Sequence, residues 1–353
     1  MTLPNLNPLR FILAFLVMLV HIPEFFRNRD LPYFNDGIIF HRGVEAVYVF
    51  FVLSGFLIIR LLYREVHDNG KIDIKKFYMR RILRIYPLYF VILISGFLYY
   101  NVVLDLAGIP YENDYNLVNA LLLYTFFLPN VGTALYHPGG AIEILWSIGI
   151  EEQFYLIIPP MLLFLRKKFF VKFFIIFTVI YFAIFASNIF PFLQRFDFLY
   201  FYFSAGGLLA VLHERYDLGN KMHKYLKFAI LIAFLLYFCT DIIKGINLNL
   251  YHFISMILFS FVILTLSYKP VINIRNAPLN YLGKISYGIY MYHPLVMQLI
   301  GLILLKLVAK IDMPDILIVI LSYGLVFGVT FIVSHFSYVY FEKPFLKLKN
   351  KFR

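Results

Sequence analysis

The stretch LRFILAFLVMLVHIPEFF, residues 9–26, decides the fold class of this chain. It is an apolar run of about 18 residues, which is long enough for an α-helix to cross the hydrocarbon core of a bilayer. The run contains Arg10 and His21, lacks a small-residue cleavage site, and is followed by further apolar runs. We therefore interpret it as a retained membrane helix and not as a secretory signal.

Similar runs recur along the whole chain of 353 residues, which is 61% hydrophobic and only 15% charged. A soluble domain usually carries about a quarter charged residues. The pattern predicts an all-α protein, a polytopic transmembrane helical bundle of about ten spans. We assign residues 1–345 to one membrane domain and 346–353 to a basic cytoplasmic tail. The predicted spans are residues 8–26, 43–63, 86–104, 146–165, 169–190, 196–212, 226–243, 250–268, 285–305 and 316–341.

The net charge of +12 is distributed unevenly between the two sides of the predicted bundle. Most of the 32 Lys and Arg residues lie in or beside the loops that are cytoplasmic if the N-terminus is inside. The positive-inside rule therefore places both termini in the cytoplasm. The charge serves orientation and contact with anionic lipids, and we expect no nucleic acid partner.

The predicted outer segment, residues 105–145, contains no Lys or Arg but carries Glu112, Asp114, His137 and Glu143. Its apolar part, residues 117–128, is too short to span and should re-enter the bilayer or lie at the interface. On the inner side, KIDIKKFYMRRILRIYP predicts a basic amphipathic helix that ends at Pro87.

Small residues predict close helix packing at two places. Gly55 interrupts an aromatic run and would allow the backbone of a neighbouring helix to approach. The segment SAGG at residues 204–207 is typical of tightly packed membrane helices. The single cysteine, Cys239, cannot form an internal disulfide, and we expect it to pack in the core.

Ionisable residues inside membrane spans are costly and usually functional. Arg10 and His21 are eleven residues apart, which is about 20° more than three full helical turns, so both should lie on one helix face. This spacing places Arg10 at the cytoplasmic entrance and His21 near mid-membrane. A histidine there can act as a general base, although a snorkelling arginine and a structural histidine fit the same pattern.

A second group of ionisable residues follows Trp146 in WSIGIEEQFY, where Glu151 and Glu152 interrupt an apolar run. One of these glutamates is expected to face a polar cavity and the other to support the structure. Glu45 lies near the outer end of the second predicted span, and Ser54 in the same span is expected to be a packing hydroxyl, since no nucleophile motif surrounds it.

Two further features complete the set. Arg80, Arg81 and Arg84 form a cluster at the inner surface, and paired guanidiniums suit bidentate binding of phosphate. His293, in GKISYGIYMYHPL at residues 283–295, is assigned a structural role.

Five segments in order resemble the acyltransferase-3 family of integral membrane enzymes, which includes O-antigen and polysaccharide O-acetyltransferases. They are LRFILAFLVMLVH, GVEAVYVFFVLSGFLI, FYMRRILRIYPLY, WSIGIEEQFYL and LGKISYGIYMYHP. The family's arginine and histidine pattern falls on Arg10 and His21, and its RxxR motif on Arg81 and Arg84. Two departures are Glu45, where many members carry aspartate, and Phe11, where glycine is common.

The resemblance implies transfer of an acyl group, usually acetyl, from cytoplasmic acyl-coenzyme A to an acceptor hydroxyl of a glycan at the outer side. It implies a bacterial cytoplasmic membrane protein and leaves open a separate periplasmic partner, and no metal or permanently bound cofactor is expected. His21 would be the general base, with Glu151 or Glu45 orienting it. Arg10, Arg81 and Arg84 would hold the donor, and Trp146, Ser54 and Glu152 would support the site.

Two alternatives remain at this point. A proton-coupled transporter or flippase would use the same buried ionisable groups as a relay, and it would be expected to show inverted repeats, which we do not detect. A membrane scaffold without catalytic activity would keep the fold alone.

Overall fold

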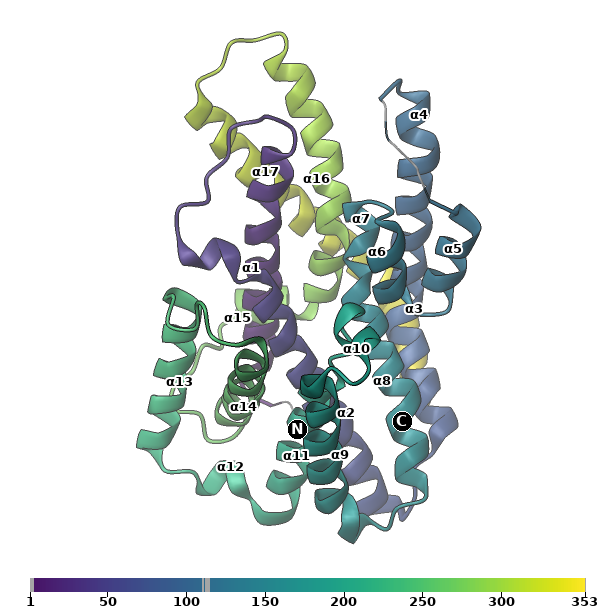
Figure 1. Ribbon diagram of the computed structural model, residues 1–353, viewed down its shortest axis with the longest axis vertical. Helices are drawn as coiled ribbons and strands as arrows, with labels where there is room; N and C mark the ends of the chain where they lie inside the picture. Colours follow the sequence, from purple (N-terminus) through teal and green to yellow (C-terminus); the bar gives the residue numbers. More distant parts are fainter. Residues whose placement is uncertain (1–2, 110, 112–114, 353) are drawn as a thin grey trace. The chain divides into compact units, whose positions relative to one another are not determined.

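The computed structural model describes residues 3–109, 111 and 115–352, and within these residues the chain forms helices and no strand (Figure 1). The all-α prediction is confirmed, whereas Glu112 and Asp114 lie outside the described residues. Each predicted span falls on a helix. These helices are α1 (Leu6–Arg27), α2 (Gly43–Asn69), α3 (Ile74–Leu98), α8 (Leu145–Leu163), α9 (Phe170–Ser187), α11 (Tyr200–Tyr216), α13 (Lys224–Cys239), α14 (Leu248–Ser267), α16 (Ser286–Val308) and α17 (Asp315–Phe336).

Seven helical segments among the described residues are long and apolar enough to cross a membrane. They are α1, α2, α14, α16, residues 74–106, residues 167–187 and residues 315–352. The helices α11 and α13 have only 17 and 16 residues, and α8 carries the two adjacent glutamates. The protein is therefore a multi-pass membrane protein, and the number of about ten spans and the sides of the termini stay predictions.

Three of these segments combine a helix with short continuations. Residues 74–106 are α3, η2 (Tyr99–Val103) and α4 (Leu104–Leu106); residues 167–187 are η3 (Lys167–Phe169) and α9; and residues 315–352 are α17, η4 (Ser337–Glu342), α18 (Lys343–Lys349) and η5 (Asn350–Phe352). The remaining short helices are η1 (Ile38–His41), α5 (Leu117–Thr125), α6 (Pro129–Tyr136), α7 (Gly140–Glu143), α10 (Pro191–Arg195), α12 (Leu218–Lys221) and α15 (Ala277–Lys284).

The helix boundary predicted at Pro87 is wrong. The basic amphipathic stretch and the following span form one helix, α3, with Pro87 inside it. Membrane helices tolerate internal proline because the freed backbone groups find other partners. The prediction that residues 117–128 are too short to span agrees with α5, which has nine residues.

Contacts between Cα atoms divide the chain into two compact units. The first unit comprises residues 1–13, 44–74 and 150–284, and the second comprises residues 14–43, 75–149 and 285–353. The first unit therefore contains α2, most of α8, and the helices from α9 to α15. The second contains most of α1, together with α3 to α7 and α16 to α18.

In the first unit, α2 and α11 pack with their backbones almost in contact. A Cβ atom on Gly55 would lie 2.0 Å from the carbonyl oxygen of Phe203, and one on Gly206 would lie 2.1 Å from that of Val52. No real Cβ can occupy such a position, so both glycines are required by the packing. The predicted close approach at Gly55 and in the SAGG segment is confirmed.

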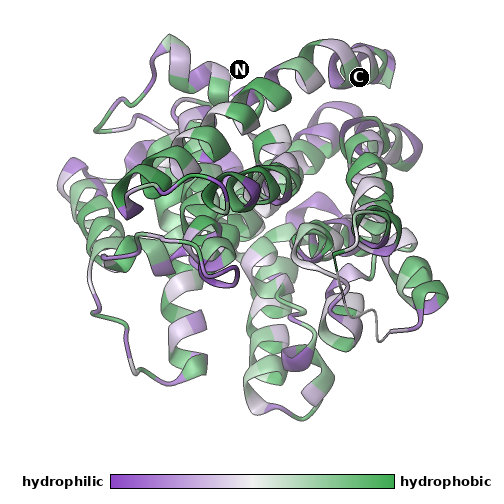
Figure 2. Ribbon diagram, turned by 90° about the horizontal axis from the view of Figure 1, so that it is seen from above, coloured by the Kyte–Doolittle hydropathy of each residue, from purple (hydrophilic) through white to green (hydrophobic). Residues whose placement is uncertain are grey.

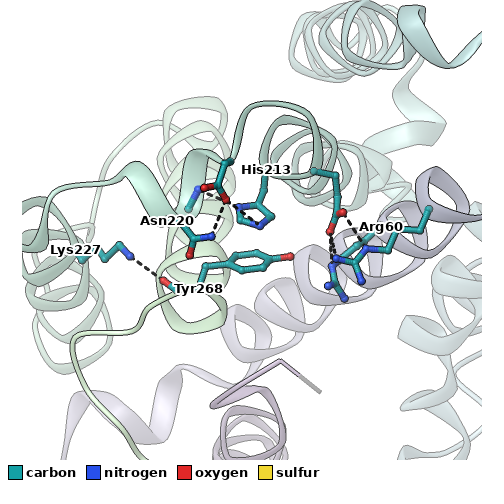
Figure 3. A network of polar contacts seen from close by, with 9 residues as sticks. Arg60, His213, Asn220, Lys227 and Tyr268 are labelled. Carbon is teal, nitrogen blue, oxygen red and sulfur yellow. Dashed lines mark hydrogen bonds and ion pairs between the residues drawn. The ribbon is translucent and has the colours of Figure 1, made fainter. Parts of the chain in front are cut away.

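A cluster of charged and aromatic residues joins α2, α11 and α14 of the first unit (Figure 3). The guanidiniums of Arg60 and Arg64 both bind the carboxylate of Glu214, at N–O distances of 2.8 and 2.9 Å. Burial opposes ionisation of Glu214, but the two arginines outweigh it and lower the pKa of this carboxyl. The ring of His213 stacks on that of Tyr268, the residue after α14. We call Arg60, Arg64 and Glu214 the arginine–glutamate cluster.

Apolar side chains cover the outside of several helices. Figure 2 shows hydrophobic residues along the helices and hydrophilic residues mainly at helix ends and in connecting segments. On α9, for example, Val179 and Ile180 are 61% and 53% exposed, which suits contact with lipid. Cys239, at the end of α13, is also exposed, so the expectation that it packs in the core is wrong.

Candidate active site

The helix α1 carries both Arg10 and His21, as predicted. The Nδ1 atom of His21 lies 2.9 Å from the Nε2 atom of His293 on α16. Both residues belong to the second unit. The planes of the two imidazole rings differ by only 9°, with centroids 5.2 Å apart. This edge-to-edge arrangement is the geometry of an N–H···N hydrogen bond.

His293 is held at its other ring nitrogen by the backbone of its own helix. Its side chain is 0% exposed, and its Nδ1 atom lies 2.6 Å from the carbonyl oxygen of Tyr290. In a regular α-helix this carbonyl would accept the N–H of residue 294. Residue 294 is proline, which has no N–H, so the His293 side chain provides the donor instead.

Contacts further along the two helices fix α1 against α16. A Cβ atom on Gly301 would lie 2.6 Å from the ring of Phe25, so the two helices approach closely there. The guanidinium of Arg29 lies over the Phe25 ring and donates to Oε1 of Gln298 at 2.8 Å. Gln298 in turn donates to the hydroxyl of Tyr100 in η2 at 2.8 Å. This network connects the end of α1 and the residues after it to α16 and η2 within the second unit.

A surface pocket of about 230 Å³ opens beside the second half of α1. Its lining begins at Val20, the residue before His21, and continues to Glu24 and Arg27 on the next turns. The loop after α1 contributes Tyr33 and Asn35. A pocket with carboxylate, guanidinium, amide and aromatic groups can bind a molecule rich in hydroxyls.

Glu24 brings a carboxylate close to His21 within the same unit. It lies three residues after His21 on α1, so both share a helix face, and the two side chains interact electrostatically. Glu24 also lines the pocket. A negative charge here favours a transient positive charge on the imidazole.

The predicted glutamates all belong to the first unit. Glu151 accepts hydrogen bonds from the hydroxyls of Ser54, at 2.7 Å, and Tyr155. Glu152 is buried, and so is Glu45. The packing role expected of Ser54 is thus a hydrogen bond between α2 and α8. The prediction that Glu151 or Glu45 orients His21 joins residues of the two units, and it stays a prediction.

The predicted donor-binding arginines lie on α3 of the second unit. Arg81 is near the ring of Phe77, with 5.9 Å between its Cζ atom and the ring centroid. Arg84 interacts electrostatically with Glu342 of η4. Their neighbour Arg80 is buried and donates to the carbonyl of Phe352 at 2.8 Å. The basic end of the chain, predicted as a tail, thus contacts α3.

The remaining candidates are dispersed. Arg10 is half-buried in the first unit, and Trp146 is half-buried near the start of α8 in the second unit. In the predicted outer segment, His137 is exposed, and its Nδ1 atom lies 3.8 Å from the Oε1 atom of Glu143. Burial raises the pKa of the Glu143 carboxyl, and His137 opposes this shift.

Two neighbours of His21 were not predicted as its partners. His293, predicted from the sequence to have a structural role, lies within hydrogen-bond distance of His21. The signal that could have found it is the His293–Pro294 dipeptide, because an intramembrane proline frees a carbonyl that a neighbouring side chain can use. Glu24 could have been found from its spacing of three residues from His21.

Comparisons with known proteins identify the family of the chain. The family model described as "Acyltransferase domain" of the acyltransferase-3 family matches residues 3–335. The chain is 29% identical over 276 residues to a protein of Acidianus two-tailed virus named "Putative acetyltransferase ORF330", covering 75% of this chain and 76% of the viral protein. No solved structure matches the chain.

A second relative comes from Staphylococcus aureus strain COL and is named "Putative O-acetyltransferase". The identity is 27% over 340 residues, which is 86% of this chain. The chain spans about half the length of this relative, 53%. Together with the family match over nearly the whole length and the apolar helices, these findings lead to one conclusion. The chain belongs to the acyltransferase-3 family and is a multi-pass membrane acyltransferase.

Proposed function

We propose that the protein is an O-acyltransferase of a bacterial cytoplasmic membrane, acting with acetyl-coenzyme A or another acyl-coenzyme A on a hydroxyl of an envelope or exported glycan. The observation that carries this proposal is the hydrogen bond between His21 and the buried His293, on a helix whose residues Val20 and Glu24 line a pocket with polar and aromatic groups. The names of the viral and staphylococcal relatives support acetyl as the transferred group and oxygen as its acceptor.

The donor would bind at the arginines. Coenzyme A carries several phosphate charges, and guanidiniums bind phosphate through paired charge-assisted hydrogen bonds. Arg81 and Arg84 lie one helical turn apart on α3, which suits one phosphate group or two adjacent ones. Arg10 is proposed as a further donor-binding residue, and the long pantetheine arm would carry the thioester toward His21.

The acceptor would enter through the pocket beside α1. The hydroxyls of a sugar can bind Glu24, Arg27 and Asn35, and the rings of Tyr33 and Phe40 can stack against its apolar face. Val20 and Glu24, which flank His21 on α1, line this pocket, and a hydroxyl of the bound sugar would have to reach the imidazole from there.

The chemistry then follows from one base. His21 removes the proton of the acceptor hydroxyl while its oxygen attacks the thioester carbonyl carbon. The tetrahedral intermediate collapses, the carbon–sulfur bond breaks, and the imidazolium returns the proton to the thiolate. The products are an O-acyl ester and free coenzyme A. Glu24 would stabilise the imidazolium.

The test is thiol release from acetyl-coenzyme A by the purified protein in detergent, with and without a panel of glycans. Acceptor-dependent release together with an acylated glycan is the expected result. Proton movement in proteoliposomes without thiol release would instead support a transporter. If the protein shows neither thiol release nor proton movement and binds no acyl-coenzyme A, the result would support a membrane scaffold without catalytic activity.

A further inference from the structure

We propose that His293 is a positioning residue that fixes the tautomer of His21, and that Pro294 makes this possible. The inference deepens the proposed function, because it rests on His21 being the base. It starts from hydrogen bonds that join three groups in a row: the Tyr290 carbonyl, the His293 ring and the His21 ring.

The direction of the first bond is decided by chemistry. A carbonyl oxygen can only accept a hydrogen bond, so Nδ1 of His293 must carry a proton. Pro294 has no N–H for this carbonyl, so the His293 side chain meets no competing donor from the regular helical pattern. The proline thereby creates the acceptor that orients the histidine.

The direction of the second bond follows. His293 is fully buried among apolar helices, where an uncompensated charge is costly, so the neutral imidazole is the stable form. A neutral ring with its proton on Nδ1 has a lone pair on Nε2. That lone pair accepts, and Nδ1 of His21 must be the donor across the 2.9 Å between them.

The consequence concerns the opposite nitrogen of His21. With its proton on Nδ1, a neutral His21 has the lone pair on Nε2 and can receive a proton there. The nearly coplanar rings give the hydrogen bond its preferred direction and resist rotation of the His21 ring. His293 thus does for His21 what an orienting group does for the histidine of a hydrolase triad, but without a negative charge.

Two substitutions separate this role from packing. His293→Gln keeps an amide oxygen that can accept from Nδ1 of His21, whereas His293→Leu fills the site with an apolar side chain that cannot accept. We expect His293→Leu to lower kcat on the order of 10–100-fold, by analogy with the groups that orient metal-ligating histidines. KM for donor and acceptor should change little. His293→Gln should retain most of the wild-type kcat.

The tautomer itself can be measured without any activity. Nitrogen NMR of protein labelled with ¹⁵N-histidine distinguishes the two neutral tautomers, and His21→Gln identifies the His21 signals among the nine histidines. We expect the Nδ1–H form for His21 in the wild type and in His293→Gln, and a mixture in His293→Leu.

The outcomes distinguish the two proposals. An Nε2–H form of His21 in the wild type, or equal kcat for His293→Leu and wild type, overturns the role of His293 even if acyl transfer is confirmed. The Nδ1–H form in a protein without transferase activity would support the orientation of His21 and reject the proposed function. Equal loss of kcat in both variants, with the tautomer unchanged, would assign His293 to packing and also overturn the inference.

Discussion

The arginine–glutamate cluster of the first unit and the histidine pair of the second unit satisfy ionisable side chains in opposite ways. In the cluster, the guanidiniums of Arg60 and Arg64 both bind the carboxylate of Glu214. In the pair, two imidazoles share a hydrogen bond whose direction is set by a carbonyl. The ion pairs of the cluster stabilise the folded protein. In the histidine pair, the Nε2 atom of His21 is the nitrogen that can accept a proton from a reactant. The difference predicts that the two regions respond oppositely to substitution.

The largest effect is expected for His21→Ala. Loss of a general base typically lowers the rate by about 10²–10⁴-fold. The variant should still insert in the membrane and fold, because the arginine–glutamate cluster and the packing of α2 on α11 are untouched, and its unfolding temperature should fall because the buried Nε2 atom of His293 loses its partner. Acetyl transfer to the active glycan, normalised to folded protein, measures the effect. A well-folded His21→Ala protein with near wild-type transfer would remove His21 from the mechanism.

The second prediction concerns the affinity for the acyl-coenzyme A donor, which we assign to Arg81 and Arg84 of α3. Each charge-assisted hydrogen bond to phosphate contributes about 1.5–3 kcal/mol. Arg81→Ala and Arg84→Ala should therefore weaken acyl-coenzyme A binding about ten- to a hundredfold, with acceptor affinity little changed. Calorimetry or equilibrium dialysis with a non-hydrolysable donor analogue gives the affinity.

Arg64→Ala is the matched control for these variants. Arg64 is also an inner-side arginine in our topology, but its guanidinium binds Glu214. It should leave donor affinity unchanged. If Arg64→Ala weakened donor binding as much as Arg81→Ala did, general positive charge and not the α3 motif would explain the binding.

Glu214→Gln should show the reverse behaviour of His21→Ala. Two charge-assisted contacts are weakened, so the free energy of unfolding should fall by about 1.5–3 kcal/mol while kcat stays unchanged. Because the pKa of Glu214 is lowered in the folded state, its stabilisation is present above the ordinary glutamate value of about 4.3 and is lost as pH falls through the lowered value. Thermal unfolding at pH 7 and below pH 4.3 should show the largest difference between the two proteins at pH 7.

The last effect concerns the glycines of the first unit and is one of stability alone. Gly55→Ala introduces a methyl group against the backbone of α11, which must move to admit it, and should destabilise by at least about 1–3 kcal/mol. Gly324→Ala on α17 is the control, since a Cβ there meets no atom within 4 Å. Equal unfolding temperatures for the two variants would contradict the close packing of α2 on α11.

The helices were predictable because each membrane span must be apolar by itself, so hydropathy along the chain determines its existence and position. The error at Pro87 has a physical reason: a rule derived from water-soluble helices overestimates the cost of proline where neighbouring groups can replace the lost hydrogen bond. The exposure of Cys239 was not predictable, because lipid and protein interior favour the same side chains.

The site was predictable only in part. The sequence identified His21, since an ionisable residue in a span stands out against its neighbours. Its hydrogen bond to His293 joins residues 272 positions apart. The spacing of residues along one helix predicts which side chains share a face of that helix. It does not predict which other helix packs against that face. The position of Glu24 required no such knowledge, since it follows from helical periodicity alone.

Cys239 offers a practical reporter of membrane orientation. It is the single cysteine of the chain, it is exposed, and it lies at the end of a helix that should terminate on the outer side if both termini are cytoplasmic. A membrane-impermeant maleimide added to intact cells would then label the natural protein without any substitution. Protection of this thiol in intact cells, followed by labelling after lysis, would reverse the assigned sidedness. The same thiol, once replaced by serine, leaves a cysteine-free background in which a reporter can be placed in any loop.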